Sequence, residues 1–425
     1  MKPFVVLSVA AIASSAAVPN LVSRQLGNFL SLFGVGGAVQ APILNQELKP
    51  QHDPAAKREL KVWGPFKLQP ANSTHGKPNG LKLDPSSDVV SAALSGICNG
   101  CMVLEAQGQM SFANGSRQDI QFGVYTHHIL FADIGRPAVS LPLGAVCPDG
   151  IKNAGGFAGQ GAALAGSGPP PGVTASGPPG QSEGHSHGRK RQAPPGSKIP
   201  PISILVGNGE DASPLVFASK DPSVKSGFYI GEEDKFGLMA EVINYDNHDK
   251  DVWFSVDIEY IEGPREPDYL DVGGGALNID GCSRGLAFHP PADKAVSYTS
   301  NDFIVGADGY LLNFTPHLHD GGINIEVFRN KTLVCHSDAV YGDGEGTTAI
   351  GGEAWETITA YTPCEKAVKV SKGDILSMSA EYDLTKHRLR PDSNNHEMGA
   401  EAMALATYVY AREPVAPAPA PAVEE

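Results

Sequence analysis

Residues 309–337 read GYLLNFTPHLHDGGINIEVFRNKTLVCHS, and this stretch decides the fold class. The runs YLLNFTPHLHD and INIEVFRNKTLVCHS are rich in β-formers and meet at an Asp-Gly-Gly turn. Such runs, bounded by turn residues, are typical of β-strands. Similar runs recur on both sides: DVVSAAL, DIQFGVYTHHILFADI, FGLMAEVINYDN and VWFSVDIEYI before it, and DILSMSAEYDL and AMALATYVYA after it. Strands follow strands without intervening helices, which disfavours a mixed α/β domain.

The composition excludes several classes of protein. The chain has 425 residues, of which 49 are Gly and 34 are Pro, too many breakers for a helical bundle or a coiled coil. Hydrophobic residues make up 41%, which excludes a fully disordered chain. The formal net charge is −15, with no basic stripe, and this argues against nucleic acid or anionic lipid as a partner.

The pattern along the chain predicts two domains. Residues 152–199 are rich in Gly and Pro and indicate a disordered insertion, and residues 413–425 indicate a disordered Pro/Ala tail. About 300 residues remain, enough for two β-sandwiches. We therefore predict an all-β fold of two consecutive antiparallel, jelly-roll-like sandwiches. The boundaries are a signal peptide over 1–17, an arm or propeptide over 18–58, a first domain over 59–262 and a second over 263–412.

The N-terminus predicts a secreted, extracellular or cell-wall protein. Lys2 and an apolar run precede small residues, so we expect a signal peptide cleaved after Ala17. No later segment has the apolar length of a membrane span. Arg189-Lys190-Arg191 marks a processing site after Arg191, or else an uncut basic patch. Four sequons predict glycosylation at Asn72, Asn114, Asn313 and Asn330.

The even number of cysteines favours structural disulfides. Cys98 and Cys101 form a CxxC that could belong to a redox or zinc motif, but the chain has no second CxxC. Disulfides are the better interpretation in an oxidising compartment. Spacing alone does not pair the six residues Cys98, Cys101, Cys147, Cys282, Cys335 and Cys364.

Two histidine pairs lie on predicted strands. His127 and His128 are adjacent, and on a regular strand they face opposite sides, which leaves one ligand and one structural histidine. They share a metal only at a bulge or a strand end. His317 and His319 are two residues apart and face the same side, which suits two ligands on one ion, although two surface histidines remain an alternative.

A thioether would complete a copper site. Met403 opens the last strand, and Met398 lies just before it. Two imidazoles and a thioether favour copper, because sulfur stabilises Cu(I), whereas zinc avoids thioethers. On spacing alone, a Met at this place is more often a core residue.

These residues in this order resemble the stress up-regulated nodulin (nodulin-nineteen-like) family, which is related to the copper type II ascorbate-dependent monooxygenases. Peptidylglycine α-hydroxylating monooxygenase and dopamine β-hydroxylase are members of the latter group. The resemblance covers residues 308–410 well and the first domain weakly, mainly through YTHHILF. It implies two copper sites, one in each domain, that face each other across a solvent-filled cleft. It also implies copper on His317, His319 and Met403, a second copper on His127 and His128, and a disulfide between Cys335 and Cys364.

One departure from the family pattern affects the first copper. The copper hydroxylases have a third His in a strand where this chain reads Glu241-Val242-Ile243-Asn244-Tyr245, and the nearest histidine is His248. The remaining histidines are unassigned or lie in predicted flexible segments: His52, His75, His185, His187, His289, His336, His387 and His396.

The sequence leaves three functions open. The first is a secreted monooxygenase that hydroxylates a C–H bond with O2, using one or two copper ions and ascorbate or another external reductant. The second is a non-catalytic copper-binding or stress-response protein without the electron-transfer copper. The third is a cell-surface interaction module without metal. The substrate, whether a small molecule or a peptide, is not encoded in a motif that we can identify, and we expect a monomer.

Overall fold

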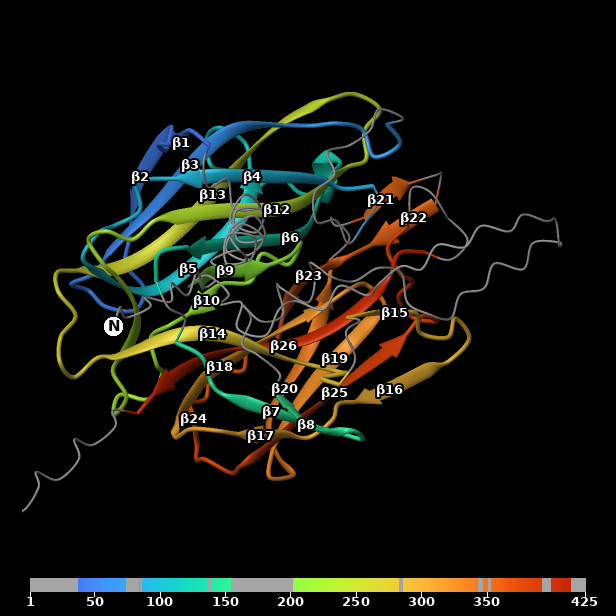
Figure 1. Ribbon diagram of the computed structural model, residues 1–425. Helices are drawn as coiled ribbons and strands as arrows, with labels where there is room; N and C mark the ends of the chain where they lie inside the picture. Colours follow the sequence, from blue (N-terminus) through green and yellow to red (C-terminus); the bar gives the residue numbers. More distant parts are fainter. Residues whose placement is uncertain are drawn as a thin grey trace, which may run out of the picture.

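Two hydrophobic cores lie between layers of β-sheet in the computed structural model (Figure 1). The structure describes residues 37–73, 84, 86–136, 139–153, 202–282, 286–342, 347–350, 353–391 and 399–413. Within these ranges, the 3₁₀ turn η1 (Ile120–Phe122) is the only helical element. The all-β prediction is therefore confirmed. The described residues contain no helix with the length and hydropathy needed to cross a bilayer.

The first core is built from the alternating apolar residues of two facing sheets. The five-stranded sheet has the order β1 (Val39–Gln40), β4 (Asp88–Leu94), β12 (Phe236–Asn244), β6 (Val124–Asp133) and β9 (Ser203–Asn208). It packs on one end of an eleven-stranded sheet, whose strands there are β2 (Leu44–Leu48), β3 (Lys57–Leu68), β13 (Lys250–Glu262), β5 (Cys101–Ser111), β10 (Leu215–Val216) and β11 (Ser226–Ile230). Trp63, Phe131 and Phe254 are fully buried between these layers and contact one another.

The second core lies under the other end of the same eleven-stranded sheet. That end consists of β14 (Leu270–Asn278), β26 (Ala402–Arg412), β18 (Gly309–Leu318), β24 (Val368–Val370) and β15 (Ala287–Phe288). It faces an eight-stranded sheet made of β23 (Ile358–Tyr361), β20 (Thr332–Tyr341), β19 (Gly322–Arg329), β25 (Ile375–Asp383), β17 (Phe303–Val305), β16 (Ala295–Thr299), β7 (Leu143–Cys147) and β8 (Gly150–Asn153). A small hairpin, β21 (Thr347–Ile350) with β22 (Glu353–Glu356), completes the fold.

The structure differs from the predicted boundaries at two places. Strands β1 and β2 lie within the expected arm of residues 18–58, yet they pair with β4 and β3. Strands β7 and β8 were expected in the first domain or at the start of the insertion, yet β7 pairs with β17 in the second. Both differences arise because β-pairing is non-local, so a strand joins whichever edge the connection reaches.

Three disulfides pair all six cysteines. They join Cys98 to Cys101, Cys147 to Cys282 and Cys335 to Cys364. The last is the pair that the family resemblance implied, and the first shows that the CxxC is a local cross-link. The signal peptide with Ala17, Arg191, nearly all of the insertion and the C-terminal tail lie outside the described residues.

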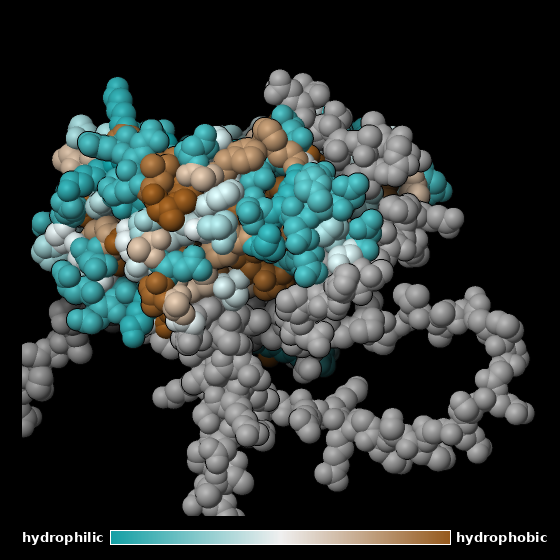
Figure 2. Space-filling model, turned by 90° about the horizontal axis from the view of Figure 1, so that it is seen from above, coloured by the Kyte–Doolittle hydropathy of each residue, from teal (hydrophilic) through white to brown (hydrophobic). Residues whose placement is uncertain are grey.

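The surface seen from above is mainly hydrophilic, with small hydrophobic areas between the polar residues (Figure 2). Charged residues of β3 and β13 pair across the two strands, as in Arg58 with Asp257. A sheet with one polar face and one apolar face is the usual form of an antiparallel sandwich layer.

Candidate metal centre

A β-bulge in β6 places both residues of the first histidine pair at one site. Glu241 of β12 pairs with His128, but the next residue, Val242, pairs with Thr126, so His127 is the extra residue. A bulge of this kind breaks the alternation of side chains. The two imidazole rings are consequently 4.1 Å apart between centroids. The structure thus contains a bulge, which is one of the two arrangements in which the sequence allows both histidines to share a metal.

The second pair lies at the end of β18, as its spacing predicts. His317 and His319 are both buried, and their ring centroids are 5.5 Å apart. Their strand pairs with β26, where His317 lies opposite Leu405 and the backbone N–H of His319 donates to the carbonyl of Met403. Residues opposite each other on antiparallel strands share a face, so Met403 belongs to the same face as the two histidines. Its side chain is buried beside Ala276 and Leu405.

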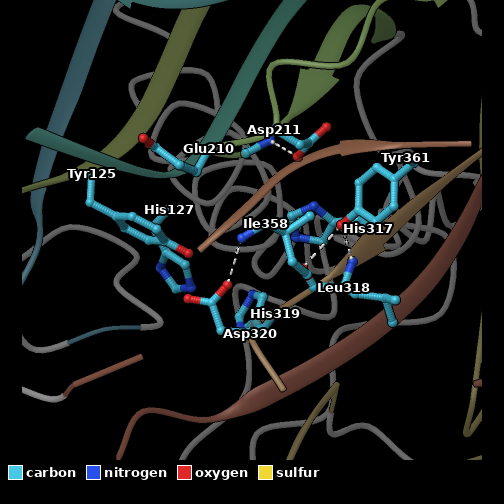
Figure 3. A pocket seen from close by; sticks show the side chains of 11 residues that line it. Tyr125, His127, Glu210, Asp211, His317, Leu318, His319, Asp320, Ile358 and Tyr361 are labelled. Atoms are coloured by element: carbon cyan, nitrogen blue, oxygen red, sulfur yellow. Dashed lines mark hydrogen bonds between the residues drawn. The ribbon is translucent and has the colours of Figure 1, made fainter. Parts of the chain in front are cut away.

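The two pairs form a single cluster. The ring centroids of His127 and His319 are 4.9 Å apart, and those of His128 and His317 are 5.0 Å apart. Two sites separated by a solvent-filled cleft, as implied by the resemblance, are therefore not seen among the described residues. Three of the four histidines line one small cavity, together with Asp211, Asp320 and Tyr361 (Figure 3).

Two carboxylates that the sequence analysis missed contact this cluster. Oε2 of Glu241 lies 3.3 Å from Nδ1 of His127 and 3.4 Å from Nδ1 of His128. Oε1 of Glu401 lies 3.3 Å from Nε2 of His127. Glu241 stands in the buried apolar run FGLMAEVIN, where a charged residue requires a partner, and this pattern was the available signal. Glu401 directly precedes the buried strand β26 in the same way.

Burial and neighbouring charges separate the protonation states of the four histidines. Burial lowers the pKa of His127, but Glu241 and Glu401 outweigh it and raise the value to about 9. Burial and the neighbouring imidazoles lower the pKa of His128, lower that of His317 well below the usual range, and bring that of His319 to about 3. His128, His317 and His319 are thus neutral at physiological pH, the form that binds a metal.

The nitrogens that face the cavity fit a metal ion. Nε2 of His317 and Nε2 of His319 are buried without a hydrogen-bond partner, and Nδ1 of His319 contacts the carbonyl oxygen of Glu401 at 2.8 Å. A backbone partner on one ring nitrogen orients the other toward a metal, which is typical of metal-ligating histidines. One atom each from His127, His128 and His319 lie within 4.8 Å of one another, close enough to share one ion.

Asp320 holds this end of β18 in place. Its carboxylate accepts hydrogen bonds from Trp355 Nε1, from the hydroxyl of Thr357 and from the N–H of Ile358, each at 3.0 Å. The hydroxyl of Tyr361 contacts the backbone N–H and carbonyl of Leu318. These bonds fix the backbone on both sides of His319.

The other described histidines lie elsewhere. His248 is exposed beside Asp246, so the nearest histidine to the family's third ligand does not reach the buried cluster. His52 and His336 contact carboxylates away from it, and His387 stacks on Tyr341. His289 is exposed. The remaining candidates lie outside the described residues: Met398, His75, His185, His187 and His396.

One predicted glycosylation site does not fit the structure. Asn313 is only 5% exposed, and its side-chain nitrogen donates to the carbonyl of Val216. A glycan on that nitrogen would require the loss of this hydrogen bond and the exposure of the side chain. Asn72, Asn114 and Asn330 are exposed, and their glycosylation stays a prediction.

Comparison with known proteins confirms the predicted resemblance. The family model described as Stress up-regulated Nod 19 matches residues 278–389, which include His317 and His319. The chain is 23% identical over 333 residues to a "Probable copper-dependent oxygenase M1" of a Phoma species, covering 78% of this chain and 67% of that protein. It is 26% identical over 189 residues to a "Probable copper-dependent oxygenase clz3" of Cochliobolus lunatus, covering 44% of this chain and 58% of that protein.

The solved structures that match this chain include PNGF-II. PNGF-II aligns over 89% of this chain and 65% of its own, with 9% identity and a TM-score of 0.32. That score is too low to indicate a shared fold.

Proposed function

From the match to Stress up-regulated Nod 19 and from the histidine cluster, we propose that this protein is a secreted copper-dependent oxygenase that hydroxylates a C–H bond with O2. The observation that carries the proposal is that both histidine pairs, 190 residues apart in the sequence, meet in one cluster in which Nε2 of His317 and Nε2 of His319 are buried without a hydrogen-bond partner. The relatives named as probable copper-dependent oxygenases support copper as the metal.

The residues of the second half supply a ligand set suited to copper. His317 and His319 would hold the ion through Nε2, and Met403, on the same sheet face, would add a thioether. Copper supplies the one-electron chemistry that lets O2 react with a C–H bond. The neutral imidazoles are available without losing a proton first, because burial keeps their pKa values low.

Hydroxylation requires two electrons and two protons from outside the protein. One oxygen atom of O2 enters the substrate and the other leaves as water, so a reductant such as ascorbate must deliver the electrons. The cavity is enclosed by Tyr361, Ile358 and the β9–β10 connection, which limits water around the ligands. The substrate class is not specified by this cavity.

Copper content and oxygen consumption test the proposal. Purified protein reconstituted with copper is expected to retain one or two ions by elemental analysis, and His317→Ala to lose at least one. His336→Ala, at an exposed ion pair, is the matched control and should keep the full copper content. Reductant-dependent O2 consumption above that of free copper, with small aromatic or peptide substrates, is the expected activity. Protein without copper after reconstitution would refute the function.

A second candidate is a copper-binding protein without catalysis. The small cavity and the burial of His127, His317 and His319, which are 2%, 8% and 6% exposed, favour it, because substrate needs access to the ion. The same copper content with no reductant-dependent O2 consumption would identify this alternative.

Secretion is part of the proposal. All six cysteines are paired, which suits an oxidising compartment. N-terminal sequencing of protein recovered from the culture medium is expected to begin at Val18. Retention of the full-length chain inside the cell would contradict this.

A further inference from the structure

A carboxylate occupies the position at which the first histidine pair lacks a third ligand. Glu241 is only 3% exposed and lies on β12, where it pairs directly with His128. The resemblance to the copper hydroxylases places Glu241 in the segment that corresponds to the strand of their third histidine. Its side chain reaches the imidazoles of His127 and His128.

Both oxygens of Glu241 are held. Oε1 accepts hydrogen bonds from the backbone N–H of Asp84 at 2.9 Å and from the hydroxyl of Ser87 at 2.7 Å. Oε2 faces Nδ1 of His127 and Nδ1 of His128, at 3.3 and 3.4 Å. One oxygen is therefore anchored to the first domain, and the other is directed at two imidazole nitrogens.

These two distances are long for hydrogen bonds and also suit ligand atoms of one shared metal ion. Hydrogen bonds from N–H to oxygen centre on about 2.9–3.0 Å, and those to a charged oxygen are shorter. Ligands bonded at about 2.0–2.1 Å to one tetrahedral ion lie roughly 3.3 Å apart. The three atoms also come from the residue types of a two-histidine, one-carboxylate site, a ligand set that is best known for Fe(II).

We propose that Glu241 is the third ligand of a metal ion held by Nδ1 of His127 and Nδ1 of His128, so that the first-domain site is present with a carboxylate in place of a histidine. The inference rests on the proposed function in taking copper as the resident metal. An anionic oxygen ligand is harder than imidazole or thioether, and this site would favour Cu(II) over Cu(I).

The test measures affinity for both oxidation states of copper in a His317→Ala background, which disables the second ligand set. Glu241→Gln keeps the size of the side chain and an acceptor for Asp84 and Ser87. The expected result is about one Cu(II) per chain in His317→Ala. Glu241→Gln should then weaken Cu(II) binding at least about 100-fold and weaken Cu(I) binding much less. Replacing a residue that only orients a ligand typically lowers metal affinity about 10–100-fold, so the expected loss is at or above the upper end of that range.

Glu259→Gln is the matched control. Glu259 is likewise buried, and it holds the backbone N–H groups of Gln51, His52 and Asp53 rather than the histidine cluster. Copper binding should be unchanged in that variant, while thermal unfolding reports whether each variant is folded. The Cu(II) electron paramagnetic resonance spectrum should change with Glu241→Gln and not with Glu259→Gln.

Three results would overturn the inference. They are equal Cu(II) affinity in the Glu241 and Glu259 variants, equal losses of Cu(I) and Cu(II), and no copper bound once His317 is removed. None of these results contradicts the proposed function, provided that the unmodified protein binds copper. If the unmodified protein binds none, Co(II) titration of the same variants, read by visible absorption, still tests the ligand role of Glu241.

Discussion

Met403 is the residue for which the sequence suggested a copper-ligand role, and its backbone lies opposite His319 on the neighbouring strand. It is 1% exposed, and its carbonyl accepts a hydrogen bond from His319. We predict that Met403→Leu weakens Cu(I) binding more than Cu(II) binding, because the thioether is a soft ligand. The swap conserves volume and should cost less than about 1.5 kcal/mol of stability. Competition titrations against Cu(I) and Cu(II) chelators measure both affinities, and equal losses would count against the thioether ligand.

Position 209 requires a glycine because the histidine cluster leaves little room for a side chain there. A Cβ built there would meet the carbonyl oxygen of His127 at 3.1 Å and Cε1 of His317 at 3.2 Å. We predict that Gly209→Ala shifts His317 and lowers copper affinity, with a loss of stability of about 1–3 kcal/mol. Gly274→Ala is the control, since its nearest atom is at 3.9 Å. Unchanged copper affinity in Gly209→Ala would show that this contact does not position His317.

At the residue scale, the sequence predicted the ligand types but only part of their arrangement. The spacing of His317 and His319 decides which face they share, so that pair was predictable. His127 and His128 converge only because β6 bulges against β12, and a bulge depends on the partner strand. Glu241 and Glu401 could have been flagged as charges beside buried apolar runs, although their partners lie far away in sequence.

Among the elements, strand β7 joins the second core by pairing with β17, by burying Leu143 and Ala145, and by one disulfide. Cys147 on β7 is bonded to Cys282, 135 residues later. We predict that replacing both by Ser destabilises the protein by about 2–5 kcal/mol, since a long loop gains much entropy in the unfolded chain when it is released. Denaturant unfolding measures the loss. The corresponding variant of Cys98 and Cys101 opens a loop with a sequence separation of only three residues, so its loss of stability should be smaller. Equal losses, or a larger loss in this variant, would contradict the prediction.

The end of β6 carries a pH-dependent contact with the β11–β12 turn. Burial and the neighbouring Asp234 raise the pKa of Asp133 from 3.8 to about 7, against the opposing effects of Gly135 and Arg136. The folded state therefore holds a proton that the unfolded state releases. Stability from this group is complete below about pH 4 and is lost as pH rises to about 7. Asp133→Asn keeps an acceptor for Gly135 and should gain stability relative to the parent between pH 5 and pH 8. The unfolding midpoints of the variant and the parent at both pH values test this prediction. A difference between the two proteins that does not change with pH would exclude the titration of Asp133 as its cause.

At the scale of the whole molecule, the two cores follow the predicted order along the chain, but the connection between them was not predictable. One eleven-stranded sheet contributes a layer to both sandwiches, through the parallel pairing of β11 with β14. Strand β7 leaves the first half to join the second. These pairings link residues far apart in sequence, and local patterns carry no information about which edges meet.

A buried ion pair joins the two halves of the protein near the histidine cluster. Arg390, from the second half, is 3% exposed and bonds to Asp84 of the first, while its Nη1 donates to the hydroxyl of Tyr245 at 2.8 Å. Removing one partner leaves a buried charge without compensation, so we predict that Arg390→Met destabilises the protein by about 3–5 kcal/mol. The double variant with Asp84→Asn should recover part of that loss. Lys57→Met, at an exposed pair with Glu262, should change stability little. Because the N–H of Asp84 also holds Glu241, the Arg390 variant should weaken Cu(II) binding as well. Additive losses in the double-mutant cycle, measured by denaturant unfolding, would mean that the two charges do not stabilise each other across the interface.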